Sequence, residues 1–203
     1  SGLLGIFEND AFEVTKSMRI DESLGAMYRQ FTQQLGWQPS LDEGKVMGLA
    51  AYGRDQESSG VDMQGQIDGM QSDYSSFFSR YPISRLTALN TPQCHDRQKA
   101  MEAPFPAIAY EVQEECERAL IEFAKYINKT TGTKNLCIAG GVALNGRANY
   151  KILTETPIEN VWVQPACSDT GLSFGLSIWA AYQIIGDENF YDKNKISMPH
   201  AYC

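Results

Sequence analysis

Apolar residues in this chain follow two periods, one typical of strands and one typical of helices. At the beginning, two short apolar runs, Leu3 to Phe7 and Ala11 to Thr15, flank a polar turn and predict a β-hairpin. Between Ser23 and Gly36 the apolar residues recur every three or four positions, which predicts an amphipathic helix that ends at the glycine. A shorter helix is predicted over Gly44 to Ala51.

The second half of the chain alternates between predicted helices and strands. A long helix that ends near Thr131-Gly132 has one apolar face, made of Ile108, Val112, Cys116, Ala119, Leu120, Phe123, Ala124 and Ile127. After it we expect a strand, a helix, a strand and a helix, over Leu136 to Ala139, Asn145 to Leu153, Val161 to Val163 and Gly171 to Ile185. Such alternation predicts an α/β protein whose mainly parallel sheet is flanked by helices.

Length and composition favour a single globular unit. The chain has 203 residues, of which 43% are hydrophobic, enough for one buried core and too few for two large ones. Residues 54–103 are rich in Asp, Gln, Ser and Gly, and their few aromatic residues, such as Tyr74 and Phe77, show little periodicity. This segment therefore predicts an irregular insert. Because the chain opens directly on an apolar strand behind Ser1, we expect it to be a piece of a longer protein.

Charge and cysteine content exclude several function classes. A formal net charge of −8 and a pI near 4.8 argue against a nucleic acid partner. No apolar run approaches the roughly 20 residues that cross a bilayer, so we expect no membrane association. Five widely spaced cysteines without a CxxC pair fit reduced thiols in a cytoplasmic protein. The two histidines, His95 and His200, lack the spacing of metal ligands.

A pair of glycines, Gly140 and Gly141, follows the predicted strand that ends at Ala139 and precedes the helix that begins near Asn145. Ligands of α/β sheets bind at the carboxyl ends of strands, where glycines let a nucleotide approach the backbone. A nucleotide or phosphate site is therefore one interpretation. A simple tight turn is the other, and this motif alone does not separate them.

Asp169 follows the next predicted strand, Val161 to Val163, in the same way. If the two strands are neighbours, it lies beside the glycine pair, where a carboxylate could bind a metal ion or a ribose. An Asp just before a Thr-Gly helix entry is more commonly an N-cap, and the residues alone favour the cap.

Gly44 and Lys45 stand at the start of a predicted helix, just after Asp42 and Glu43. A lysine beside helix N-terminal amides suits an anion, although the segment lacks the GxxxxGK[ST] spacing of a P-loop. The alternative is a helix of small residues packed on the sheet, with Lys45 at the surface. A further acidic run, Glu111, Glu114, Glu115 and Glu117, is interpreted as the solvated face of the long helix rather than a catalytic cluster.

Three segments in this order resemble a known family. They are the predicted helix from Ser23 to Gly36 followed by EGKVMGLAAYG (Glu43 to Gly53), then CIAGGVALN (Cys137 to Asn145), then VWVQPACSDTGLSFG (Val161 to Gly175). Together they resemble the O-carbamoyltransferases of nodulation-factor and antibiotic biosynthesis. The resemblance implies an actin-like lobe of the actin, sugar-kinase and Hsp70 (ribonuclease H-like) fold group, with a mixed sheet flanked by helices.

The resemblance also implies a reaction and its site residues. A carbamoyl group would pass from carbamoyl phosphate, through an ATP-derived carbamoyl-adenylate, to the hydroxyl of a small-molecule acceptor. Gly140, Gly141 and Asn145 would contact the adenosine part of the donor, and Asp169 would bind a divalent metal ion, iron. Gly44 and Lys45 match a motif lining the same cleft.

The chain also departs from that family's pattern. It has no HxxxH motif, and it lacks both the early motifs of the first lobe and the carboxyl-terminal domain that makes the donor. We therefore expect residues 1–203 to be part of one actin-like carbamoyltransferase domain that is inactive alone, with acceptor specificity in the insert 54–103. An exposed half-cleft with apolar edges would favour a homodimer. Two alternatives are an actin-like ATPase or sugar-kinase lobe and a non-catalytic nucleotide-binding or interaction domain.

Overall fold

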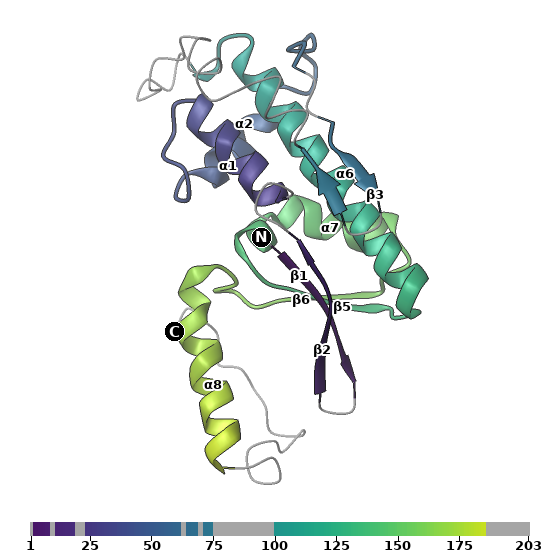
Figure 1. Ribbon diagram of the computed structural model, residues 1–203. Coiled ribbons are helices and arrows are strands. Elements are labelled where there is room, and N and C mark those ends of the chain that lie inside the picture. Colours follow the sequence, from purple (N-terminus) through teal and green to yellow (C-terminus); the bar gives the residue numbers. More distant parts are fainter. Residues whose placement is uncertain are drawn as a thin grey trace.

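The computed structural model describes residues 2–8, 11–18, 23–61, 64–68, 71–74 and 100–185. Within these residues, helices form the core and the strands lie in short pairs (Figure 1). The strands are β1 (Gly2–Glu8), β2 (Ala11–Met18), β3 (Gln66–Asp68), β4 (Gln71–Asp73), β5 (Asn135–Ile138) and β6 (Asn160–Val163). The α-helices are α1 (Leu24–Gln34), α2 (Glu43–Ala50), α6 (Phe105–Thr131), α7 (Gly146–Glu155) and α8 (Leu172–Ile185), and two 3-10 turns are η3 (Gly141–Leu144) and η4 (Asp169–Gly171).

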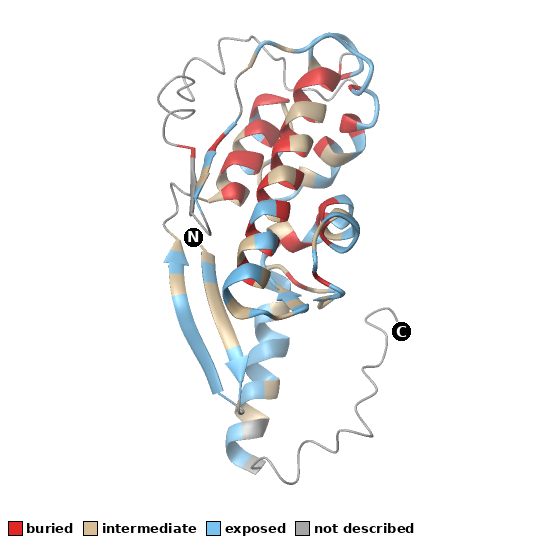
Figure 2. Cartoon of the chain, turned by 90° about the vertical axis from the view of Figure 1, so that its right-hand side faces the viewer, coloured by how far each residue is buried: buried red, intermediate tan, exposed pale blue. Residues whose placement is uncertain are grey.

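Helix α6 is the central element, and it packs against α1 and α2 at its amino-terminal half. Its length is 27 residues, and it ends at Gly132, whose φ of 72° allows the left-handed cap predicted from the sequence. Met27, Phe31 and Val46, all almost fully buried, meet Val112 of α6 in the largest core cluster. Figure 2 shows the buried residues gathered on these helices. The amphipathic patterns thus identified the core helices correctly.

The β5–β6 pair and α7 pack against the carboxyl-terminal half of α6. Ala124 of α6 packs with Ile152 of α7 and with Ile158, and Leu136 and Ile138 of β5 cover this second cluster. Helices α6 and α7 therefore both pack against the β5–β6 pair, in agreement with the predicted helices on the faces of a parallel sheet.

The predicted sheet is only partly present. Three separate two-stranded sheets occur among the described residues, β1–β2 and β3–β4 antiparallel and β5–β6 parallel. The α/β class and the hairpin are confirmed, but the residues that the structure describes do not form a single mainly parallel or mixed sheet. The reason is that periodicity reveals where a strand lies and not which strand it pairs with.

The insert 54–103 is less irregular than predicted. It supplies β3 and β4, and its Tyr74 is fully buried in the core cluster of α1, α2 and α6. A single aromatic residue within a polar segment has no period to reveal its burial. Phe77, Phe78 and Tyr81 lie outside the described residues, as do Cys94, His95, His200 and Cys203.

Helix α8 and most of the hairpin are exposed (Figures 1 and 2), although Leu4 and Met18 of the hairpin pack against Phe123 and Ile127 of α6. Exposed apolar side chains on them include Leu3, Phe7, Phe12, Leu172, Leu176 and Trp179. Across the described ranges, no helix has the length and apolar character required to pass through a bilayer.

Candidate functional site

Two loops meet at one edge of the β5–β6 pair. The strands are parallel and in register from Asn135↔Asn160 to Ile138↔Val163, so both chains leave the pair at the same end. There the backbone N–H of Gly140 donates a 2.6 Å hydrogen bond to the carbonyl oxygen of Cys167. The glycine pair and the segment that leads to Asp169 are therefore neighbours, as the sequence predicted.

The two glycines of the first loop differ in whether their backbone conformation would accept another residue. Gly140 has a φ of 103°, a conformation that a side chain would strain. Gly141 has ordinary backbone angles, and a Cβ built there would meet nothing within 4 Å. The fold therefore needs glycine at 140 but not at 141, and the space beside Gly141 is free for a group that approaches the backbone.

Asn145 joins the loop to the helix behind it. Its side-chain oxygen accepts a 3.1 Å hydrogen bond from the backbone N–H of Ala148, so Asn145 is the N-cap of α7. Its amide also exchanges two hydrogen bonds with the amide of Gln113, of 2.9 and 3.0 Å. The side chain is buried and engaged inside the protein, and its predicted contact with a ligand stays a prediction.

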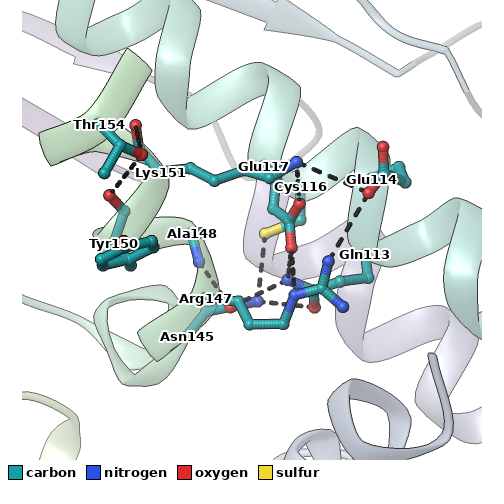
Figure 3. A network of polar contacts seen from close by, with 10 residues as sticks. All are labelled: Gln113, Glu114, Cys116, Glu117, Asn145, Arg147, Ala148, Tyr150, Lys151 and Thr154. Atoms are coloured by element: carbon teal, nitrogen blue, oxygen red, sulfur yellow. Dashed lines mark hydrogen bonds and ion pairs between the residues drawn. The ribbon is translucent and has the colours of Figure 1, made fainter. Parts of the chain in front are cut away.

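Gln113 is the centre of a buried polar network (Figure 3). Its side-chain oxygen accepts hydrogen bonds from the Tyr28 hydroxyl at 2.9 Å and from Asn145. Its amide nitrogen donates to Asn145 and, at 2.6 Å, to Glu117. Burial raises the pKa of the Tyr28 hydroxyl well above its usual range, so this group is a donor at neutral pH.

Glu117 anchors α7 to α6. One carboxylate oxygen lies 3.0 Å from Nε of Arg147, and the other lies 2.6 Å from Nζ of Lys151. Glu114 adds longer ion pairs to the same two bases, of 3.8 and 3.7 Å. The hydrogen bond that Lys151 donates to Glu117 raises the pKa of Lys151, which stays charged.

The interpretation of the acidic run as a solvated face is therefore wrong for two of its members. Glu117 is 1% exposed and Glu115 is 4% exposed. Glu115 accepts hydrogen bonds from the Gly65 backbone N–H at 2.9 Å and from the Tyr74 hydroxyl at 3.1 Å, and it pairs with Arg118. These partners lie in the insert and in α6, and they offset the cost of burying the charge.

Asp169 is exposed and begins η4, and Ser168 occupies the N-cap position. Within the described part of the chain, its carboxylate has no hydrogen bond or ion pair. The N-cap interpretation that the residues alone favoured is thus not what the structure shows. The loop that leads to Asp169 is held to Gly140, and the role of Asp169 as a metal ligand stays a prediction.

Gly44 and Lys45 have a different setting. Nζ of Lys45 lies 2.9 Å from Asp42, which neutralises its charge at the start of α2, and 56% of the Lys45 side chain is exposed. Hydrogen bonds from Lys45 and from the Gln38 backbone lower the pKa of Asp42. Because Asp42 already pairs with Lys45, little positive charge is left at this helix start to bind an anion. The role of Gly44 and Lys45 in the donor site stays a prediction.

The described residues do not by themselves complete a metal site. No group of three His, Cys, Asp or Glu side chains converges anywhere in the ranges that the structure covers. Asp169 fits the part of a single oxygen ligand, and further ligands have to come from other residues.

Sequence comparison identifies the family of the chain. The sequence model of the carbamoyltransferase N-terminus matches residues 2–178, almost the whole of the described chain. The chain belongs to this family. The resemblance to carbamoyltransferases drawn from the three motifs is confirmed.

Related proteins from several bacteria align over most of the chain. The nodulation protein NolO of Bradyrhizobium diazoefficiens is 28% identical over 195 residues, covering 91% of this chain and 33% of NolO. The nodulation protein NolNO of Sinorhizobium fredii is 28% identical over 188 residues, covering 91% of this chain and 26% of NolNO. The uncharacterised protein sll1178 of Synechocystis sp. is 32% identical over 180 residues, covering 79% of this chain and 28% of the relative. The chain thus spans about a quarter to a third of the length of these relatives.

Proposed function

We propose that this chain forms one wall of the donor site of a carbamoyltransferase. In this proposal the enzyme uses carbamoyl phosphate and ATP to make carbamoyl-adenylate and transfers the carbamoyl group to the hydroxyl of a small molecule. The loop with Gly140 and Gly141 receives the adenosine part of the donor, and Asp169 faces the same site from the neighbouring loop.

The observation that supports this most directly is the hydrogen bond from Gly140 to Cys167. This hydrogen bond holds the glycine loop against the loop that leads to Asp169, whose carboxylate has no hydrogen bond or ion pair in the described chain. Open glycine backbone and a free carboxylate at the carboxyl ends of parallel strands are the usual elements of a nucleotide site. The family match favours carbamoyl transfer over phosphoryl transfer by an actin-like ATPase or a sugar kinase.

The transfer needs a hydroxyl that loses its proton and a carbonyl oxygen that gains negative charge. A divalent metal ion, proposed here as iron, would supply both effects when bound, by polarising the carbonyl and acidifying the hydroxyl. Asp169 would hold it as one ligand among several. Gly141 leaves its backbone open to the donor, and Asn145 ties this loop to α7.

We also propose that the lobe belongs to the actin, sugar-kinase and Hsp70 group. The parallel β5–β6 pair with α6 and α7 packed against it supports this assignment, because that group builds its nucleotide site at the carboxyl ends of such strands.

The test uses the full-length protein with labelled carbamoyl phosphate, ATP and a panel of hydroxyl acceptors. Asp169→Asn should lower carbamoyl transfer by about a hundredfold while the unfolding temperature stays unchanged, because Asp169 has no structural partner in the described chain. The matched control is Glu159→Gln, which removes an exposed carboxylate at the opposite end of the β5–β6 pair, where it pairs with Lys134. That variant should transfer normally.

Each alternative function gives a different result. Transfer of phosphate from ATP to an acceptor would support the kinase. Binding of nucleotide without any transfer would support the non-catalytic module. Equal activity of Asp169→Asn and the unchanged protein would remove Asp169 from the site.

A further inference from the structure

Every hydrogen-bonding position of the Gln113 side chain is used. Its oxygen accepts from Tyr28 and Asn145, and its nitrogen donates to Asn145 and Glu117. Because an ionised carboxylate only accepts hydrogen bonds, Glu117 fixes which end of the Gln113 amide faces it. The Gln113 amide therefore has one orientation, and so has the Asn145 amide paired with it.

Asn145 transmits this orientation to the loop. It ends η3 and begins α7, and its backbone N–H donates a 3.0 Å hydrogen bond to the carbonyl of Val142. Asn149 of α7 holds the same turn through a 2.8 Å hydrogen bond to the carbonyl of Ala143. The segment from Gly140 to Asn145 is thus fixed by α6, by α7 and by the Cys167 loop.

The contact between Gln113 of α6 and Asn145 at the start of α7 is polar, and packing alone does not explain why. Two helices can be joined as well or better by apolar side chains, whereas a buried polar network lowers stability unless every member is paired. What an amide pair adds is a single geometry. That geometry is imposed at the junction between the glycine loop and α7.

We infer that Gln113 is a positioning residue for the donor site, which holds the Gly140 to Asn145 loop in its receiving conformation through its amide pair with Asn145. Gln113 is fully buried, so in this inference it acts through Asn145 and not by contact with the donor. This inference rests on the proposed function and names a residue on which that site depends.

The experiment measures AMP binding by calorimetry in the full-length protein, with AMP as the probe for the adenosine part of the donor. Gly141→Val identifies the binding event of this loop, because it fills the open position beside the backbone. Gln113→Met keeps the side-chain volume and removes the amide. It should raise the dissociation constant of the same event by about tenfold, the scale expected when a buried amide loses its partners.

Two further variants test whether Gln113 acts through Asn145. Asn145→Ala should weaken AMP binding, and the double variant Gln113→Met/Asn145→Ala should bind no worse than Asn145→Ala alone, since coupled residues are not additive. If Gln113→Met is too unstable to measure, Tyr28→Phe removes one hydrogen bond from the Gln113 oxygen. It should raise the dissociation constant by about two- to threefold.

A control separates positioning from stability. Tyr74→Phe removes a buried hydrogen bond to Glu115 on the opposite side of α6, so it should lower the unfolding temperature and leave AMP binding unchanged. The inference is overturned if Gln113→Met lowers the unfolding temperature but leaves AMP binding unchanged, as expected for Tyr74→Phe. The same result for Tyr28→Phe overturns it when Tyr28→Phe is used in place of Gln113→Met. If Gly141→Val leaves AMP binding intact, the proposed donor site itself fails, whatever Gln113→Met does.

Discussion

Glu117 of α6 lies 2.6 Å from Lys151 of α7, although only 1% of the Glu117 side chain is exposed. The same carboxylate pairs with Arg147 and accepts a hydrogen bond from Gln113. Glu117 is thus a buried charge at the contact between two helices, and three side chains depend on it.

Glu117→Ala should destabilise the protein by about 3–5 kcal/mol, because it leaves two cations and a buried amide without their acceptor. Urea unfolding measures the loss. The matched control is Glu122→Ala on the same helix, which breaks an exposed pair with Lys125 and should cost at most about 1 kcal/mol. Equal losses of unfolding free energy in the two variants would mean that the buried ion pairs of Glu117 stabilise the protein no more than an exposed pair does.

Two glycines near the end of α2 should respond in opposite ways. A Cβ at Gly53 would lie 1.9 Å from the carbonyl oxygen of Pro106, so Gly53→Ala should destabilise the protein by about 1–3 kcal/mol. A Cβ at Gly48 would meet nothing within 4 Å inside the helix, so Gly48→Ala should stabilise it by about 0.5–1 kcal/mol. Thermal unfolding of both variants checks the contrast, which fails if they shift the melting temperature in the same direction.

Cys116 should react slowly with thiol reagents. Burial, followed by the nearby charges of Glu117 and Glu115, raises the pKa of its thiol to about 12. At pH 8, iodoacetamide should therefore modify the exposed Cys137 before Cys116, which peptide mass mapping detects. Faster labelling of Cys116 would show that α6 and α7 separate readily.

The Cys116 thiol should also make the free energy of unfolding decrease as the pH becomes alkaline. The folded state holds the Cys116 proton more tightly than the unfolded state, whose thiol has the ordinary value of 9.0. The contribution is fully present below pH 9 and is lost as the pH rises from about 9 toward about 12. Cys116→Ala should flatten the decline of unfolding free energy in this window, and a decline of unchanged slope would assign it to other groups.

Tyr74 should fix the insert to α6. Tyr74→Phe removes the donor to Glu115 and should cost about 1 kcal/mol of unfolding free energy. Hydrogen exchange at the Gly65 amide, which bonds to the same carboxylate oxygen, should become faster. Tyr52→Phe, at an exposed tyrosine, is the control and should change neither quantity.

The sequence was sufficient for features that depend on near neighbours. The helices ending at Gly36 and Gly132, the hairpin, and the meeting of the Gly140 and Asp169 segments all follow from local period, cap chemistry and the geometry of parallel strands. The period and the helix cap depend only on residues that are close in the chain. The meeting of the two loops depends only on the fact that parallel strands end at the same edge of a sheet.

The buried network was not predicted, because its members come from distant segments. Gln113 and Glu117 meet Asn145, Arg147 and Lys151 more than 25 residues further along the chain, and Glu115 meets Gly65 and Tyr74. One local signal was present. Arg147 and Lys151 stand four residues apart on α7, and Glu114 and Glu117 stand three apart on α6, so two helices offer complementary rows of charge.

Gln113 and Glu115 are two positions apart on α6, so their side chains point in directions about 160° apart around the helix. One holds the glycine loop through Asn145, and the other holds the insert through Gly65 and Tyr74. In evolutionary terms the two attachments are separable. A substitution that breaks the hydrogen bonds of Gly65 or Tyr74 can be inherited without the loss of any hydrogen bond of Gln113, because the two attachments share no residue.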